Sequence, residues 1–320
     1  MAARAHLLDA YRLMHRRTGQ ALLTGRADGP SPLRRMNIAL VCGLLVGLVA
    51  LAGTAVASRR SPADTLDRPG TLVIERETGA RYVRCGPHRL CPALNYTSAR
   101  LAAGPGFLLR TASRRDVAGF GRGPSLGVQG APDSLPDARH LVGGSWAACV
   151  TGSSAVTLVL GRSVGHPLDG ATTVPVTSAD HSWLLQGGLR HLVTGPAPAG
   201  ALQVPMTWLT NLPIGPDIPT PPSLGASGGP LCLGPFGVSS GGALPGGGPL
   251  YLPPGGTAVV DVQSNGAHKY ALLADGRRYD LASVQVLRLL GYKPGDAVAV
   301  PAVFLTGVPA GPALDRIPLP

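Results

Sequence analysis

A serine within a glycine-rich run is the first residue of this chain that could do chemistry. Ser227 lies in the segment Gly225-Ala226-Ser227-Gly228-Gly229-Pro230. A serine hydroxyl becomes a nucleophile when a histidine accepts its proton and an acidic residue orients that histidine. With both partners the chain would be a secreted or membrane-tethered protease, so the presence of those partners decides the interpretation.

The run resembles the Gly-Asp-Ser-Gly-Gly-Pro loop of chymotrypsin-like serine proteases, but the rest of that machinery is missing. Ala226 replaces the acidic residue before the nucleophile, and residues 146–149 read Trp-Ala-Ala-Cys, without the histidine of the protease motif. A two-barrel protease also needs more chain between its histidine and serine segments. Any chain offers loose triples of suitable residues, here Ser227 with His181 or His191 and Asp169 or Asp217. We therefore predict that Ser227 is not catalytic.

Other enzymatic signatures are absent from the sequence as well. No Gly-x-x-x-x-Gly-Lys-Ser/Thr loop occurs, because neither Lys269 nor Lys293 follows a glycine. The only glutamates, Glu75 and Glu77, lie close together near a linker and do not suggest a glycosidase carboxylate pair. The histidines show no metal-ligand spacing with the cysteines. We expect no catalytic, cofactor-binding or metal-binding residues, and an enzyme is not the favoured interpretation.

Four of the five cysteines predict two disulfides. Cys85, Cys91, Cys149 and Cys232 all follow the apolar segment described below, and an even number in an external region favours pairing. Three connectivities are possible. Cys85 and Cys91 flank a Gly-Pro turn, so we expect them to pair across a hairpin, which leaves Cys149 for Cys232 by elimination.

A charge-free apolar segment predicts a helix that crosses a membrane. Residues 38–57 contain no charged side chain, and a helix of about 20 residues spans the hydrocarbon core of roughly 30 Å. A signal peptide is the alternative, because Ala-Val-Ala before Ser58 looks like a cleavage site. The 37 residues before the segment are long for a signal peptide, so a retained transmembrane helix is favoured.

The positive charge of the chain is concentrated around that segment. The net charge is +11, and residues 1–60 hold nine arginines and two aspartates. A nucleic-acid-binding protein would spread its basic residues over a folded face, so we expect no nucleic-acid partner. Seven arginines precede the apolar segment. The positive-inside rule then predicts a cytoplasmic N-terminus and an extracytoplasmic C-terminal part.

The cytoplasmic segment, residues 1–37, is predicted to contain an amphipathic helix. Apolar side chains recur there at three- to four-residue spacing, which is typical of one helix face. The stripe consists of Leu7, Tyr11, Met14 and Leu22. Such a stripe could lie on the inner leaflet or pack on a cytoplasmic partner, and the spacing does not choose between them.

The external part is predicted to be mainly β with short helices, an α+β fold. With 45 glycines and 32 prolines, the chain favours short strands joined by tight turns. A linker at 58–70 leads to hairpin-plus-helix units at 71–108 and 267–310, with a degenerate unit at 181–220. In the last unit, Asp275-Gly276 indicates a hairpin turn and Ser283 a helix N-cap. Residues 109–180 and the Gly/Pro-rich 221–266 would form a disulfide-linked β core, and 311–320 an extended tail.

These segments together resemble the EccB membrane component of type VII (ESX) secretion systems. The leader "DAYRLMHRRTGQALLTG", the segment "GVQGAPDSLP" and the final "ADGRRYDLASVQVLRLLGY" are similar to actinobacterial members. The residues that match the family's first external repeat are Asn95, Thr97, Ser98, Ala99, Arg100 and Leu101. Cys149 and Cys232 map onto the family's core disulfide. The external part of the family usually carries four repeats, whereas this chain offers three candidates.

The resemblance implies a structural, single-pass inner-membrane subunit of a secretion complex. Its partners would be the lipid bilayer and other ESX membrane subunits, including the FtsK/SpoIIIE-type motor ATPase, in a higher-order oligomer. The external domain would help to form or gate the export path. Some members are described as ATPases, although this chain lacks the corresponding motif. The alternative is a stand-alone, membrane-anchored envelope binding module, which would not need the cytoplasmic amphipathic helix.

Overall fold

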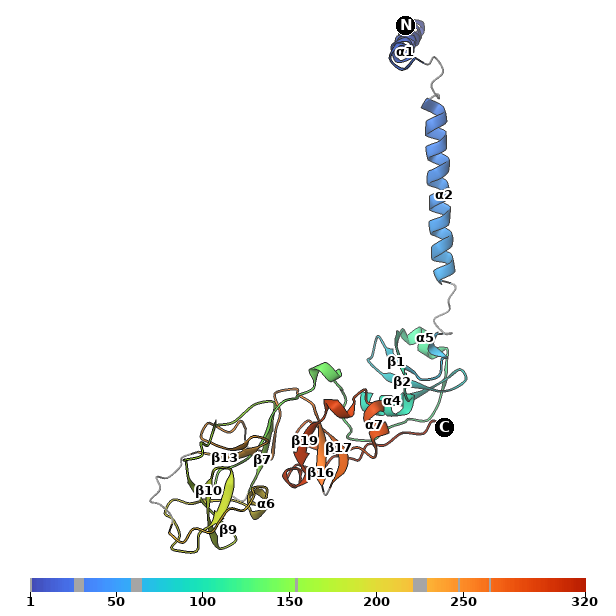
Figure 1. The fold of residues 1–320 in the computed structure, drawn as a ribbon. Helices are drawn as coiled ribbons and strands as arrows, with labels where there is room; N and C mark the ends of the chain where they lie inside the picture. Colours follow the sequence, from blue (N-terminus) through green and yellow to red (C-terminus); the bar gives the residue numbers. More distant parts are fainter. Residues whose placement is uncertain are drawn as a thin grey trace. The chain divides into compact units, whose positions relative to one another are not determined.

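The computed structural model describes residues 2–25, 32–58, 65–152, 155–220, 229–246, 248–264 and 266–320. The chain divides into two compact units, Met1–Ser61 and Pro62–Pro320. Figure 1 shows the helical first unit and the second unit of short strands and helices. Mainly β structure with short helices is confirmed for the second unit.

The described residues of the first unit form two helices. Helix α1 spans Ala2–Thr24 and helix α2 spans Pro32–Ser58. Proline suits the first position of α2, because that N–H has no partner within a helix. Over the part of the chain that the structure describes, none of the helices combines the length and the apolarity needed for a membrane crossing.

Three sheets of the second unit share one strand order. The first contains β1 (Thr71–Glu75), β2 (Arg81–Gly86), β3 (Arg89–Ala93), β4 (Leu108–Ala112) and β5 (Gly121–Arg122). The middle sheet contains β9 (Val174–Ser178), β10 (His181–Gln186), β11 (Leu189–Leu192) and β12 (Leu202–Gln203). The last contains β16 (Ala258–Ser264), β17 (Ala267–Ala274), β18 (Arg277–Asp280) and β19 (Val298–Pro301). In each, three strands form an antiparallel meander and the fourth returns parallel beside the first.

Short helices occupy corresponding places in these sheets. Before the fourth strand lie α4 (Tyr96–Ala103) in the first sheet and α7 (Val284–Leu289) in the last. After the fourth strand lie α5 (Arg114–Ala118), α6 (Met206–Leu209) and the 3-10 helix η3 (Ala302–Leu305). The Ser283 hydroxyl accepts a bond from the amide of Val286, which confirms the predicted N-cap. Further 3-10 turns are η1 (Ala138–His140) and η2 (Pro294–Asp296).

A glycine-proline segment closes each of the three sheets. Residues 120–126, 212–218 and 308–314 read Phe-Gly-Arg-Gly-Pro-Ser-Leu, Leu-Pro-Ile-Gly-Pro-Asp-Ile and Val-Pro-Ala-Gly-Pro-Ala-Leu. We call these the Gly-Pro segments. Each runs parallel to the third strand of its sheet. The first sheet therefore continues beyond residue 108, and the tail after residue 308 is a part of the last sheet.

Equivalent backbone bonds hold the three Gly-Pro segments. The amides of Gly123, Gly215 and Gly311 donate to third-strand carbonyls at 3.0, 2.9 and 2.7 Å. A Cβ at these glycines would collide with Cys91, with the ring of His191 and with the ring of Tyr279, respectively. Glycine is therefore required, since the segment lies directly on a third-strand side chain.

A central six-stranded sheet is assembled from two separate parts of the chain. Its order is β15 (Leu250–Tyr251), β7 (Thr157–Leu160), β6 (Trp146–Val150), β13 (Leu231–Gly234), β14 (Gly237–Ser240) and β8 (His166–Pro167). The middle sheet is inserted in the chain between β8 and β13. The glycine-rich stretch 237–251 thus contributes two strands, β14 and β15, to this sheet.

Two hydrophobic clusters join the sheets of the second unit. One contains side chains of the central, middle and last sheets, including Trp146, Trp208 and Phe304. The other joins Leu101 of α4 to Leu272 of β17 and to α7. The first and last sheets therefore share a core through the two helices that precede their fourth strands.

Candidate functional site

The residues of the family motif gather in and around α4. Asn95 is the N-cap: its side-chain oxygen accepts from the Ser98 amide at 2.8 Å, which satisfies one of the free donors of the first turn. Its side-chain nitrogen donates to the carbonyl of Val128 at 2.9 Å. One amide side chain thus starts the helix and also fixes a loop 33 residues further along.

Thr97 and Ser98 hold the same loop from the first turn of α4. The Thr97 hydroxyl donates to the Pro132 carbonyl at 2.6 Å, and the Ser98 hydroxyl accepts from the Val128 amide at 2.9 Å. Both side chains are fully buried. Hydroxyls can be buried at this place because each has a partner. The loop fixed in this way is the "GVQGAP" segment that the resemblance singled out.

Arg100 and Leu101 connect α4 to the last sheet. Nε and Nη2 of Arg100 donate to the carbonyl oxygen of Leu289, at 3.2 and 3.0 Å, in the last turn of α7. The guanidinium also lies 3.8 Å from the centroid of the Phe107 ring. Leu101 is fully buried, and Ile317 of the tail donates its amide to the Leu101 carbonyl. The remaining motif residue, Ala99, is buried against the first sheet.

The motif residues therefore form a structural junction. Asn95, Thr97, Ser98 and Arg100 each hydrogen-bond to protein groups far away in the chain. Groups that are bonded and buried in this way position chain segments rather than act on a ligand. Tyr292, next to α7, extends the junction by donating to the Pro136 carbonyl at 2.9 Å, and burial raises its pKa.

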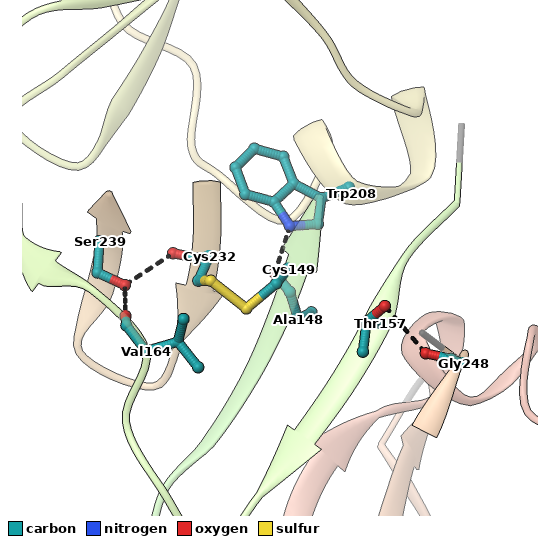
Figure 2. The surroundings of a disulfide bond; sticks show 8 residues. All are labelled: Ala148, Cys149, Thr157, Val164, Trp208, Cys232, Ser239 and Gly248. Atoms are coloured by element: carbon teal, nitrogen blue, oxygen red, sulfur yellow. Dashed lines mark hydrogen bonds between the residues drawn. A yellow bond between two sulfur atoms is a disulfide. The ribbon is translucent and has the colours of Figure 1, made fainter. Parts of the chain in front are cut away.

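One disulfide joins the two halves of the central sheet. Cys149 of β6 and Cys232 of β13 lie opposite each other in antiparallel register, with Cα atoms 4.0 Å apart. Figure 2 shows this bond between the strands, with the Trp208 indole nitrogen donating to the Ala148 carbonyl at 2.7 Å. The bond closes a loop that contains the whole middle sheet. The disulfide therefore joins a strand that precedes the inserted middle sheet in the chain to a strand that follows it.

The other disulfide lies in the β2–β3 hairpin. Cys85 and Cys91 have Cα atoms 5.8 Å apart, and Cys85 falls where the strand register shifts. Gly123 of the first Gly-Pro segment packs directly on both sulfur atoms. The corresponding third-strand residues of the other sheets are His191 and Tyr279, which the Gly-Pro segments cover in the same way. The disulfide thus occupies a packing position that a ring fills elsewhere.

The predicted docking stripe is exposed on α1. Leu7, Tyr11, Met14 and Leu22 are 71%, 65%, 70% and 84% exposed. The Tyr11 ring contacts His15 one turn later, with centroids 4.9 Å apart. An exposed apolar stripe on a helix is unfavourable in water, so a covering surface is expected.

The structure does not assemble a catalytic group from the candidate enzyme residues that it describes. Ser227 lies outside the described residues. His181 and His191 each bond to a backbone carbonyl close by. Glu75 is buried beside Arg114 and Tyr82, and the hydrogen bond from Arg114 holds the pKa of Glu75 below its ordinary value. The described residues contain no group of histidine, cysteine and carboxylate side chains suited to a metal.

Two features are not predictable from any single pattern in the chain. The Gly-Pro segments become visible when residues 120–126, 212–218 and 308–314 are aligned, since a single Gly-Pro pair indicates only a turn. Phe236 is the other feature, with 93% of its surface exposed at the tip of the β13–β14 hairpin. An exposed phenylalanine has no signature in the sequence.

The comparisons with known proteins agree on one family. Residues 2–221 match the family described as "Type VII secretion system ESX-1, transport TM domain B". The chain is 31% identical over 299 residues to "ESX-5 secretion system ATPase EccB5" of Mycobacterium tuberculosis, covering 84% of this chain and 55% of that protein. The M. marinum protein of the same name is 29% identical over 347 residues, covering 98% and 64%.

A solved structure supports the fold. The "EccB3 dimer from the ESX-3 core complex" aligns with a TM-score of 0.55 and 20% identity, covering 77% of this chain and 98% of that one. The chain spans about half the length of the M. tuberculosis relative that it matches. The family match, which covers more than half of the chain, carries the assignment. The protein therefore belongs to the EccB family of type VII secretion components.

Proposed function

We propose that this protein is a structural, single-pass membrane subunit of a type VII (ESX) secretion complex. The observation that carries the proposal is the family match over residues 2–221, which includes both the N-terminal helices and much of the external region. The residues of the family motif also support a structural role, because they form a junction between the first and last sheets. A rigid, disulfide-linked domain behind a membrane anchor is suited to a scaffold.

The anchor in this proposal is residues 38–57. This stretch of α2 contains no charged residue, and arginines precede it at 34 and 35. The N-terminus would then be cytoplasmic and the domain after residue 65 extracytoplasmic, in agreement with the positive-inside rule. Two disulfides support an oxidising environment for that domain.

Helix α1 would dock on another subunit at the cytoplasmic side. Its apolar stripe is exposed along at least four turns, and the family resemblance points to the FtsK/SpoIIIE-type motor ATPase as the partner. A simple anchor would not need such a helix. This is the feature that favours a complex subunit over a stand-alone envelope binding module.

The external domain would be built from three copies of one unit around the disulfide-linked central sheet. The shared strand order and the three Gly-Pro segments support this division. In a complex, the domain would help to form or gate the export path. Curated relatives are named as ATPases, but this proposal assigns no nucleotide hydrolysis to the present chain, whose lysines lack the phosphate-binding context.

Export from cells that encode this chain tests the proposal. Deleting the gene should abolish secretion of the small helical-hairpin substrates of the system. The full chain should restore it, and a chain of residues 38–320 should not. Undiminished secretion in the deletion strain would contradict the proposed function, whereas restoration by residues 38–320 would contradict only the role given to α1.

A further inference from the structure

One face of the first sheet is open, whereas the corresponding faces of the middle and last sheets are covered. We call it the α5 face, because it carries helix α5. In the other two sheets the corresponding faces carry α6 and η3, and Trp208 and Phe304 bury them in one hydrophobic cluster with the central sheet. On the first sheet, Val73 of β1 and Val117 of α5 belong to a small separate cluster. All described residues of that cluster lie between 66 and 120, none of them in the central sheet.

Four arginines lie on the α5 face. Arg110 of β4 stands opposite Val73 on β1, and opposite residues of a sheet point to the same side. Two further arginines begin α5. The guanidinium of Arg122 lies 4.4 Å from the centroid of the Tyr82 ring, which packs against the same small cluster. All four arginines are exposed, so their charges face the solvent.

The middle and last sheets have uncharged residues at the same positions. Arg110 pairs with the first strand of its sheet as Leu202 and Val298 do in theirs, and each following helix begins four residues later. The alignment of the Gly-Pro segments gives the counterparts of Arg122. The four arginines and their counterparts are Arg110 with Leu202 and Val298, Arg114 with Met206 and Ala302, Arg115 with Thr207 and Val303, and Arg122 with Ile214 and Ala310. The shared fold therefore does not require these charges.

The nearby carboxylates do not cancel the charge of the α5 face. Glu75 is buried beneath Arg114, and Asp116 is part of the N-terminal cap of α5. Glu77 accepts a hydrogen bond from the Arg114 amide at 2.8 Å. Residues 65–133 hold ten arginines and five acidic residues, whereas residues 134–320 hold nine basic and nine acidic residues. The excess positive charge of the external domain therefore belongs to the region of the first sheet.

The chain from the proposed anchor arrives on this same face. Leu66 is 2% exposed and is a member of the small cluster. The next residue, Asp67, accepts from Nε of Arg84 at 3.1 Å and from the His88 amide at 2.9 Å. Six residues, 59–64, connect this segment to α2. An extended chain gains at most about 3.6 Å per residue, so Thr65 stays within about 25 Å of the end of α2.

We propose that the α5 face binds anionic phospholipid headgroups on the extracytoplasmic surface of the membrane. Arginine forms forked, charge-assisted hydrogen bonds with phosphate oxygens. Basic residues close to a membrane are attracted to anionic lipids, and the attraction fades over a Debye length of about 10 Å. The short connection after α2 keeps lipid within reach, which favours a membrane over an acidic protein as the partner. The inference rests on the proposed function for its anchor at residues 38–57.

Site-specific photocrosslinking of the full chain in cell membranes tests this docking. The photoreactive residue p-benzoylphenylalanine replaces Ala118, which is exposed on α5. Leu45 of α2 is the positive control, and Phe236, 93% exposed on the central sheet, is the negative control. Lipid adducts should form at positions 45 and 118 and not at 236. A protein adduct at 118, or no adduct there, would overturn the docking, whereas loss of the adduct at 45 would contradict the anchor of the proposed function.

Nanodiscs of defined composition test the charge dependence. Lipid adducts at position 118 should increase when phosphatidylglycerol is added to phosphatidylcholine. Arg110→Gln/Arg115→Gln/Arg122→Gln should abolish the increase, and Arg110→Lys/Arg115→Lys/Arg122→Lys should retain it, because lysine keeps the charge. Arg114 is left in place because it holds Glu75. The matched control removes three exposed arginines outside the first sheet and should leave the increase unchanged: Arg277→Gln/Arg288→Gln/Arg316→Gln.

Three results would overturn the docking. The first is an undiminished increase in the glutamine variant of the α5 face, and the second is an equal loss in the control variant. The third is a loss in the lysine variant, because the effect would then not follow the charge. Both experiments are independent of export. Lipid docking without export would contradict the proposed function alone, and export without lipid docking would contradict the docking alone.

Discussion

Arg100 on α4 donates two hydrogen bonds to the carbonyl oxygen of Leu289 on α7, across 189 residues of sequence. The carbonyls of the last helical turn lack partners within the helix, and a basic side chain can satisfy them. The helix of the first sheet thereby caps the helix of the last. Gly291, just after α7, has a φ of 91° and leaves space for the guanidinium.

Arg100→Met should destabilise the external domain. The substitution removes both charge-assisted bonds and the contact with Phe107, so we expect a loss of about 1.5–3 kcal/mol in the free energy of unfolding. Arg288→Met is the matched control, because Arg288 is exposed on α7. Chemical denaturation of the two variants makes the comparison, and equal stability would show that the capping bond is not important.

Gly311→Ala should destabilise the last sheet. The added methyl group collides with the Tyr279 ring, and overpacking of this kind costs about 1–3 kcal/mol. Gly295→Ala serves as the control, since a methyl group added there would have no heavy atom within 4 Å, and it should change stability by less than about 0.5 kcal/mol. Thermal denaturation of both variants measures the difference. A neutral Gly311→Ala would refute the packing argument for all three Gly-Pro segments.

The two disulfides should contribute unequally to stability. In the chain-entropy model, closing the 83-residue separation of Cys149 and Cys232 is worth about 4.5 kcal/mol. Closing the 6-residue separation of Cys85 and Cys91 is worth about 2 kcal/mol. Paired alanine variants measured under non-reducing conditions compare the two. Peptide mapping that finds Cys85 joined to Cys232, or four free thiols, would contradict the connectivity itself.

Glu75 should make stability depend on pH in the acidic range. Bonds from Arg114 and Tyr82 favour the carboxylate, so the pKa of Glu75 is lower in the folded protein than in the unfolded chain. This contribution is present above the unfolded value of about 4.3 and is lost as pH falls through the folded pKa. The melting temperatures of the wild type and Glu75→Gln should therefore differ most at pH 7 and converge towards pH 3. A pH-independent difference would argue against an ionic role.

Local features of the fold were predictable from the sequence, and distant pairings were not. The Asp275-Gly276 turn and the Ser283 cap depend on a few neighbouring residues, and both occur in the structure. The bond from Arg100 to Leu289 depends on how two distant helices pack, which no local spacing encodes. The central sheet was not predictable for the same reason, because its strands come from chain segments before and after the inserted middle sheet. Cysteines gave the one sequence signal for that assembly, because a covalent pair must be close in space.

Co-purification of the motor ATPase with α1 variants tests the central claim most directly, namely that the chain is a docked subunit of a secretion complex. Replacing Leu7 and Tyr11 together with serine removes two exposed apolar side chains, each worth about 1.5–3 kcal/mol when buried by a partner. The variant should remain in the membrane and lose the ATPase in detergent extracts. Arg12→Glu/Arg16→Glu is the control for binding to anionic lipid and should keep the ATPase. Undiminished recovery with the serine variant, and loss with the glutamate variant, would contradict the account.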